Sequence, residues 1–262
     1  MDAELERSGA PTLFYQTDGA GPAVVLIHGV GADGGSWDDI APVLATRFSV
    51  IRLDLRGHGR SGHIDGALTL DDFVRDVLDV MAAAGAAQAH VAGFSLGGLI
   101  AQALALDHPS QVDRLVLLSA VAGRTEQERA RVRERLEILR TQGIGAITGA
   151  AQDRWFTPGF IERHPESVRQ RMEQLQSNHP ASYAAAYTVF STSDLGDRLH
   201  GITRPTLVAT GEHDLGSNTR MARFMHAQIA GSELRILPGL KHSVLVEAPT
   251  QIAAMLLAFL TA

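Results

Sequence analysis

The sequence contains no cysteine among its 262 residues. This absence excludes disulfides and thiolate metal sites, and it fits a cytoplasmic protein. Long apolar runs are also missing, since the most apolar predicted helix, at 252–260, is far too short to cross a bilayer. Residues 1–7 are charged and lack the apolar core of a signal peptide. We therefore expect no membrane partner.

Basic residues are fewer than acidic ones, 23 against 29, so the formal net charge is −6. A chain with this balance offers no basic face for nucleic acid, so none is expected as a partner. The sequence also lacks a P-loop, an H-E-x-x-H motif and any metal-spaced cluster of His and Asp. We expect neither a metal nor a cofactor, and the sequence leaves homo-oligomerisation open.

The most informative stretch is Gly93-x-Ser95-x-Gly97, which has the G-x-S-x-G pattern of a nucleophile elbow. An apolar strand-like run precedes it and an apolar helix-like run follows it. A turn this sharp forces the serine into a strained backbone conformation and projects its hydroxyl above the sheet. The two glycines lack a Cβ, so neighbouring elements can approach closely. The pattern predicts Ser95 as a catalytic nucleophile.

Strand-like runs, several of them continuously apolar, alternate with helical segments on both sides of the elbow. They include residues 24–27, 49–53, 115–118, 205–210 and 234–237. This alternation predicts an α/β fold with a mostly parallel sheet and helices on both faces. Ser36 is expected to begin a helix that runs to about Ala45.

The alternation stops between about Ala122 and Arg198, where only helical segments are predicted. We expect residues 1–121 and 199–262 to form the core, and residues 122–198 to form an inserted helical cap, or lid. The expected cap helices are 125–140, 144–155, 158–176 and 181–190. The arginines of the first are expected on a solvated face, with Arg133 and Glu137 as an i,i+4 pair.

An elbow serine needs an acid and then a histidine later in the chain. The strand-end loops after the helical segment supply Asp214 and His242. His242 is expected to take the proton of Ser95, and Asp214 to fix the imidazole tautomer and stabilise the imidazolium. The alternative is that Asp214 caps a helix and Glu212 is the acid.

Two backbone N–H groups are expected to bind the oxyanion. One belongs to Leu96, directly after the nucleophile, and the other comes from the loop after the strand that ends at His28. Val30 is the preferred donor in that loop, and Gly31 is the alternative.

A competing pattern occurs in the same loop. Gly29-x-Gly31-x-x-Gly34 follows a strand, and Asp54 lies 20 residues beyond Gly34, as in a dinucleotide-binding fingerprint. However, the pattern is repeated at residues 57–62, and polar residues occupy the positions where a fingerprint helix is apolar. We therefore reject the dinucleotide-binding interpretation.

Together these motifs resemble the α/β-hydrolase superfamily, and the resemblance covers nearly the whole chain. It rests on residues 28–29, 54–61, the elbow, 211–214 and 241–242. It implies an eight-stranded, mostly parallel sheet with a helical cap inserted after the sixth strand. The cap segment at 154–160, followed by Glu162 and Pro165, is similar to that of the 3-oxoadipate enol-lactonases. The chain departs from these at Leu215, where a proline commonly follows the acid, and in the loop of Val30.

The chain is thus expected to be a serine hydrolase that cleaves a small carboxylic ester or lactone, of the enol-lactone type, through an acyl-enzyme. Phe94 and Trp155 are the expected apolar walls of the substrate pocket, although Trp155 alternatively belongs to the cap core. Arg154 is a candidate ligand for a substrate carboxylate, but an exposed surface arginine is the preferred interpretation. Hydrolysis of a C–C bond in ring-cleavage products, and cofactor-free perhydrolysis, use the same triad and remain alternatives. A ligand-binding protein without turnover is the alternative of another class.

Overall fold

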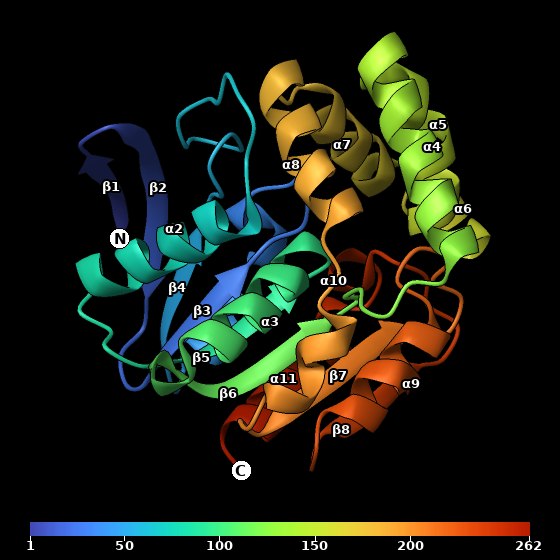
Figure 1. The fold of residues 1–262 in the computed structure, drawn as a ribbon. Coiled ribbons are helices and arrows are strands. Elements are labelled where there is room, and N and C mark those ends of the chain that lie inside the picture. The colour runs from blue at the N-terminus through green and yellow to red at the C-terminus, as the bar shows by residue number, and fades with distance from the viewer.

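A computed structural model describes residues 1–262. It contains one eight-stranded sheet, as the resemblance implied, in the order β1-β2-β4-β3-β5-β6-β7-β8 (Figure 1). The strands are β1 (Asp2–Arg7), β2 (Ala10–Asp18), β3 (Ala23–Ile27), β4 (Ser49–Leu53), β5 (Ala89–Phe94), β6 (Val112–Leu118), β7 (Thr206–Gly211) and β8 (Glu233–Leu237). The pairs β1–β2 and β2–β4 are antiparallel. All the other neighbouring pairs, from β4–β3 to β7–β8, are parallel.

Helices cover both faces of the sheet. They are α1 (Ala41–Leu44), α2 (Leu70–Ala83), α3 (Leu96–Asp107), α9 (Thr219–Gln228), α10 (Val244–Glu247) and α11 (Pro249–Leu260), with 3-10 turns at η1 (Gly34–Trp37), η2 (Pro109–Gln111) and η3 (Gly196–Gly201). Alternate residues of β3 point to opposite faces, so Val25 packs in the cluster that contains α2, α3 and α9. Val24 packs in the cluster that contains α1 and α11. This burial on both faces explains the continuous apolar strands in the sequence.

The helix expected from Ser36 to Ala45 is wrong in its extent. The chain forms the short η1 turn and then the four-residue α1. Asp33, not Ser36, is the N-cap, because its side chain accepts a hydrogen bond from the Gly35 amide.

Five helices lie together above the edge where the parallel strands end, at the top of Figure 1. They are α4 (Glu126–Gln142), α5 (Gly145–Trp155), α6 (Pro158–Arg163), α7 (Pro165–Gln176) and α8 (Pro180–Thr192). We refer to these five helices as the cap helices. The single helix expected over 158–176 breaks at His164, because Pro165 restricts the residue before it to a non-helical conformation.

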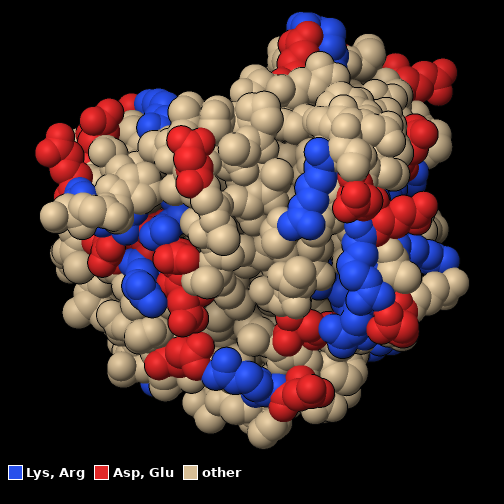
Figure 2. All heavy atoms as spheres, turned by 45° about the horizontal axis from the view of Figure 1, so that its top comes forward, with Lys and Arg blue, Asp and Glu red and all other residues tan.

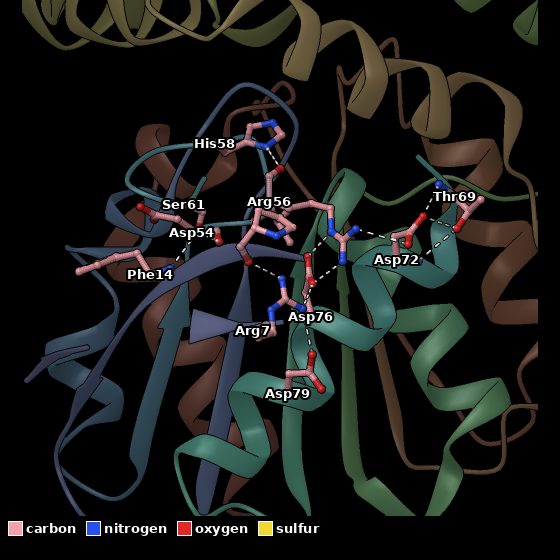
Figure 3. A network of polar contacts seen from close by, with 12 residues as sticks. Arg7, Phe14, Asp54, Arg56, His58, Ser61, Thr69, Asp72, Asp76 and Asp79 are labelled. Carbon is pink, nitrogen blue, oxygen red and sulfur yellow. Dashed lines mark hydrogen bonds and ion pairs between the residues drawn. The ribbon is translucent and has the colours of Figure 1, made fainter. Parts of the chain in front are cut away.

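A buried charge network joins the N-terminal hairpin to α2 (Figure 3). The Arg56 guanidinium donates to both oxygens of Asp76 on α2, at 2.6 Å each. Arg7 of β1 donates to the same carboxylate at 2.5 Å and to Asp79 at 2.9 Å. The Asp76 side chain is completely buried, so its charge has to be compensated inside the protein, and the two guanidinium groups do so. The network thus joins β1, α2 and the loop after β4.

No helix of the structure is both long enough and apolar enough to span a membrane.

Candidate active site

The strained elbow expected at Ser95 is present. Ser95 joins β5 to α3 with φ 55° and ψ −112°, outside the conformations that a side-chain-bearing residue usually adopts. A Cβ on Gly93 would lie 2.1 Å from the carbonyl oxygen of Gly97, and one on Gly97 would lie 2.2 Å from that of Ile27. Both positions therefore require glycine, and the close packing holds the turn in its strained form.

Asp214 and His242 meet at the end of the sheet. The Nδ1 atom of His242 lies 2.7 Å from Oδ2 of Asp214, so this nitrogen carries the proton that it donates to the carboxylate. Glu212 is half exposed, and its carboxylate accepts a hydrogen bond from the Gly239 amide. Asp214 is thus the carboxylate that the structure brings to the histidine.

The surroundings of Asp214 keep it ionised. Burial raises the pKa of Asp214, but the charge of His242 and its hydrogen bond lower it, as do the amides of Ser217 and Gly216. These amides donate to Oδ1 at 2.9 and 2.8 Å. The balance leaves the pKa of Asp214 below its usual value. A buried anion in this place fixes the tautomer in which Nε2 of His242 is free to accept a proton.

The two backbone N–H groups expected to bind an oxyanion have no partner in the protein. Neither the Val30 amide nor the Leu96 amide donates a hydrogen bond to another group of the chain. Buried amides are nearly always paired, so such groups beside a cavity fit donors reserved for a ligand.

The residues that imitate a dinucleotide fingerprint bind each other. The Gly34 amide donates a hydrogen bond to Oδ1 of Asp54 at 2.7 Å.

A cavity of about 480 Å³ lies between the strand ends and the cap helices. Ser95, Asp214 and His242 line it, together with Val30. A volume of this size fits a small molecule.

The three residues predicted for the substrate pocket also line this cavity. The Phe94 ring centroid lies 5.1 Å from that of His242, and the Trp155 centroid lies 6.5 Å away. Arg154 is half-buried rather than exposed, so the interpretation as a plain surface arginine is wrong. Burial, and secondarily the positive charge of Arg135, lower the pKa of Arg154.

Several cavity residues were not anticipated from the sequence. They are Arg124, Arg131, Arg135, Arg171, Tyr183 and Tyr187. The expectation of a solvated face on α4 therefore fails for Arg135, which is half-buried, whereas Arg131 lines the cavity but is exposed. It holds for Arg133, which is exposed, although its partner is Glu126 instead of Glu137. The one sequence feature that could have indicated any of these cavity residues is the i,i+4 pair Tyr183 and Tyr187 in the alanine-rich α8.

Elsewhere the charged surface is mixed. On the face drawn in Figure 2, uncharged residues cover much of the surface, and most of the Lys and Arg side chains lie beside Asp or Glu. The structure contains no group of three or more His, Cys, Asp or Glu side chains arranged to hold a metal ion.

The fold and this site define the class of protein. Residues 22–143 match the model of the alpha/beta hydrolase fold family. The chain is 30% identical over 239 residues, 90% of its length, to 3-oxoadipate enol-lactonase 2 of Acinetobacter baylyi, of which it covers 88%. The chain belongs to the α/β-hydrolase family and is a hydrolase.

Two further relatives refine this likeness. The chain is 31% identical to (E)-2-((N-methylformamido)methylene)succinate hydrolase of Acinetobacter baylyi, with 98% of this chain and 97% of that protein covered. The crystal structure of the enol-lactonase from Burkholderia xenovorans LB400 superposes with a TM-score of 0.92 and 29% identity, covering 99% of this chain and 100% of the other. The predicted similarity to enol-lactonases is confirmed.

Proposed function

We propose that the chain hydrolyses a small carboxylic ester or lactone that carries a carboxylate, through an acyl-enzyme on Ser95. The observation that carries this proposal is the Asp214–His242 hydrogen bond, at 2.7 Å, at the wall of a cavity that Ser95 also lines. A serine, a histidine and a buried carboxylate in this arrangement are the parts that acyl transfer needs.

The reaction begins when Oγ of Ser95 attacks the substrate carbonyl carbon while Nε2 of His242 takes the hydroxyl proton. The carbonyl oxygen becomes an oxyanion, which the amides of Val30 and Leu96 bind. Collapse of this intermediate breaks the C–O bond, and His242 returns the proton to the leaving oxygen. In a lactone that oxygen stays attached to the acyl chain. Water, deprotonated by His242, then attacks the acyl-enzyme and regenerates Ser95.

The arginines around the cavity support an anionic substrate. Five of them line it, namely Arg124, Arg131, Arg135, Arg154 and Arg171. None of the five forms an ion pair with an Asp or Glu of the chain. The guanidinium of Arg154 also makes no hydrogen bond, and burial lowers its pKa. A substrate carboxylate would supply the missing charge to this planar donor.

The test compares matched substrates. Arg154→Gln should lower kcat/KM about 10- to 100-fold for a carboxylate-bearing lactone, the worth of one charged hydrogen bond. The neutral methyl ester of the same lactone should change little. Arg133→Gln is the control, because Arg133 is exposed on α4 and pairs with Glu126. Equal losses on both substrates would remove the carboxylate from the proposal. Faster turnover of a diketone, or of peroxide with acetate, would favour C–C hydrolysis or perhydrolysis instead.

A further inference from the structure

The loop that carries the Val30 amide, residues 29–32, turns at Gly31 in a backbone conformation that favours glycine. Gly31 has φ 69°. A Cβ there would lie 2.6 Å from Cε2 of Tyr183 and 2.8 Å from Cδ1 of Leu175. Two cap helices, α7 and α8, therefore pack directly against this loop. We refer to residues 29–32 as the oxyanion loop.

Three polar side chains from α7 and its C-terminal end bind the same segment. Arg171 donates from Nη1 to the carbonyl oxygen of Gly31 at 2.8 Å, and Asn178 donates from Nδ2 to that oxygen at 3.3 Å. Gln174 donates from Nε2 to Oδ2 of Asp33 at 2.7 Å. Arg171 and Gln174 are three residues apart and share one face of α7, and Asn178 follows just after the helix ends. One helix face thus binds the loop at two neighbouring points.

Arg171 is suited to this contact because no carboxylate competes for it. It forms no ion pair within the chain, and its guanidinium carbon lies 4.6 Å from the centre of the Trp155 ring. Stacking on the ring restricts the guanidinium plane, and the remaining contact is a charge-assisted hydrogen bond to a neutral carbonyl. Such a contact orients a peptide group strongly.

From these contacts we propose that Arg171, with Gln174 and Asn178, is a positioning residue that aims the Val30 amide at the oxyanion. The inference rests on the proposed function, because it assigns this amide a role in acyl transfer. In this proposal α7 holds the oxyanion loop in position, in addition to covering the cavity. When α7 is displaced from the core, the Gly31 carbonyl loses both side-chain donors, and the oxyanion loop is free to rotate. Donors must be held within a few tenths of an ångström to stabilise a developing charge.

The kinetic test uses p-nitrophenyl acetate, whose neutral acyl group makes no demand on an arginine for binding. Arg171→Gln and Asn178→Ala should lower kcat about 10- to 100-fold, part of the loss expected when an oxyanion donor is removed. KM should stay within about twofold. Phenylboronic acid, which forms a tetrahedral adduct on a serine, should bind more weakly by the same factor as kcat/KM falls. Arg171→Lys should recover part of the loss.

The matched control is Arg169→Ala on the opposite face of α7. Arg169 is 56% exposed and binds only Glu166 and Glu173, so its removal should leave kcat and boronate affinity unchanged. A change in KM alone for the Arg171 variants would show a substrate-binding residue and overturn the inference. Unchanged kcat would also overturn it.

A second measurement separates this inference from the proposed function. Hydrogen exchange of a peptide covering residues 29–34 reports the loop directly, whether or not the substrate is turned over. The peptide should exchange faster in Arg171→Gln than in wild type and in Arg169→Ala. Identical exchange in all three would contradict the positioning role even in an active enzyme. If exchange is faster in Arg171→Gln but the wild-type protein does not hydrolyse p-nitrophenyl acetate, the result would instead contradict the proposed function.

Discussion

The amide of Ser243 donates a hydrogen bond to the carbonyl oxygen of Trp155, at 3.0 Å. Ser243 directly follows His242, and Trp155 is the last residue of α5. The loop of the histidine is therefore joined to the cap helices, as the oxyanion loop is joined to them through Arg171. Both loops that flank Ser95 thus depend on the same group of helices for their position.

Glu247 strengthens the first of these connections and provides a prediction. Its Oε1 atom accepts hydrogen bonds from the amide and the hydroxyl of Thr157, both at 2.7 Å, and Oε2 accepts from the Lys241 amide at 3.1 Å. Glu247→Ala leaves two amides unpaired, so we expect a loss of about 1–3 kcal/mol in the free energy of unfolding. We also expect a roughly 10-fold lower kcat, because the histidine loop becomes looser.

Urea unfolding and steady-state kinetics check both parts. Glu233→Ala is the control, since Glu233 is 48% exposed and pairs with Arg235 on the same strand. A Glu247 variant with full stability and full kcat would show that the histidine loop holds its place without the cap.

The contact between Asp214 and His242 gives the second prediction. Asp214→Asn should lower kcat by about 10³- to 10⁴-fold, because an amide that donates a hydrogen bond to Nδ1 stabilises the wrong imidazole tautomer. Glu212→Gln should change kcat little, because Glu212 contacts the Gly239 amide rather than the histidine. Kinetics of the two variants at saturating substrate make the comparison. A larger loss in the Glu212 variant would reverse the assignment of the acid.

The sequence was sufficient for the strand-end residues. Ser95, Asp214 and His242 each follow a strand of the sheet, and the carboxyl ends of parallel strands meet at one edge of the sheet. Chain order and strand position therefore bring these three residues together without knowledge of any side-chain packing.

The cap residues could not be placed in this way. Arg135 lies on a helix whose face carries charges of both signs, which is typical of a solvated surface. Periodicity shows which residues of a helix share a face, but not what that face packs against. The cavity-lining positions of Arg135 and Arg171 depend on how the cap helices sit above the sheet. Local patterns do not determine that arrangement, so these residues were missed.

The buried network around Asp76 gives the third prediction. Asp76→Ala removes the carboxylate between Arg7 and Arg56 and leaves two partly compensated cations beside α2 (Figure 3). We expect about 3 kcal/mol lower free energy of unfolding, the usual cost of breaking a buried pair. Asp79→Ala is the control, because Asp79 is 48% exposed and its pair should contribute about 0–1 kcal/mol. Equal effects in urea unfolding would show that the burial of Asp76 is unimportant.

Two buried histidines give a prediction for pH. Burial lowers the pKa of His28 to about 4. Burial, and secondarily the charge of His28, lower the pKa of His58 to about 3. Below pH 6.5 the unfolded chain protonates both imidazoles while the folded protein does not, so the free energy of unfolding falls as pH drops from about 6.5 to about 3. Above pH 6.5 this contribution is constant.

The variant His58→Gln tests this dependence. The Nδ1 atom of His58 lies 3.1 Å from the carbonyl oxygen of Arg56, and its Nε2 atom has no partner. Glutamine retains a donor but does not titrate. Urea unfolding between pH 4 and pH 6.5 should therefore give a shallower slope for the variant than for wild type. Equal slopes for variant and wild type would show that His58 does not contribute to the pH dependence of the free energy of unfolding.

The central claim is that Ser95 is the nucleophile of an acyl-transfer site, and labelling with a fluorophosphonate tests it most directly. Intact mass should show one adduct per chain, peptide mapping should place it on Ser95, and Ser95→Ala should remain unlabelled while it retains its unfolding midpoint. Val30 and Leu96 favour this reaction, because the phosphonyl oxygen develops charge where their amides are free. An adduct on Ser61 or Ser119, or no adduct on the folded wild-type protein, would contradict the account.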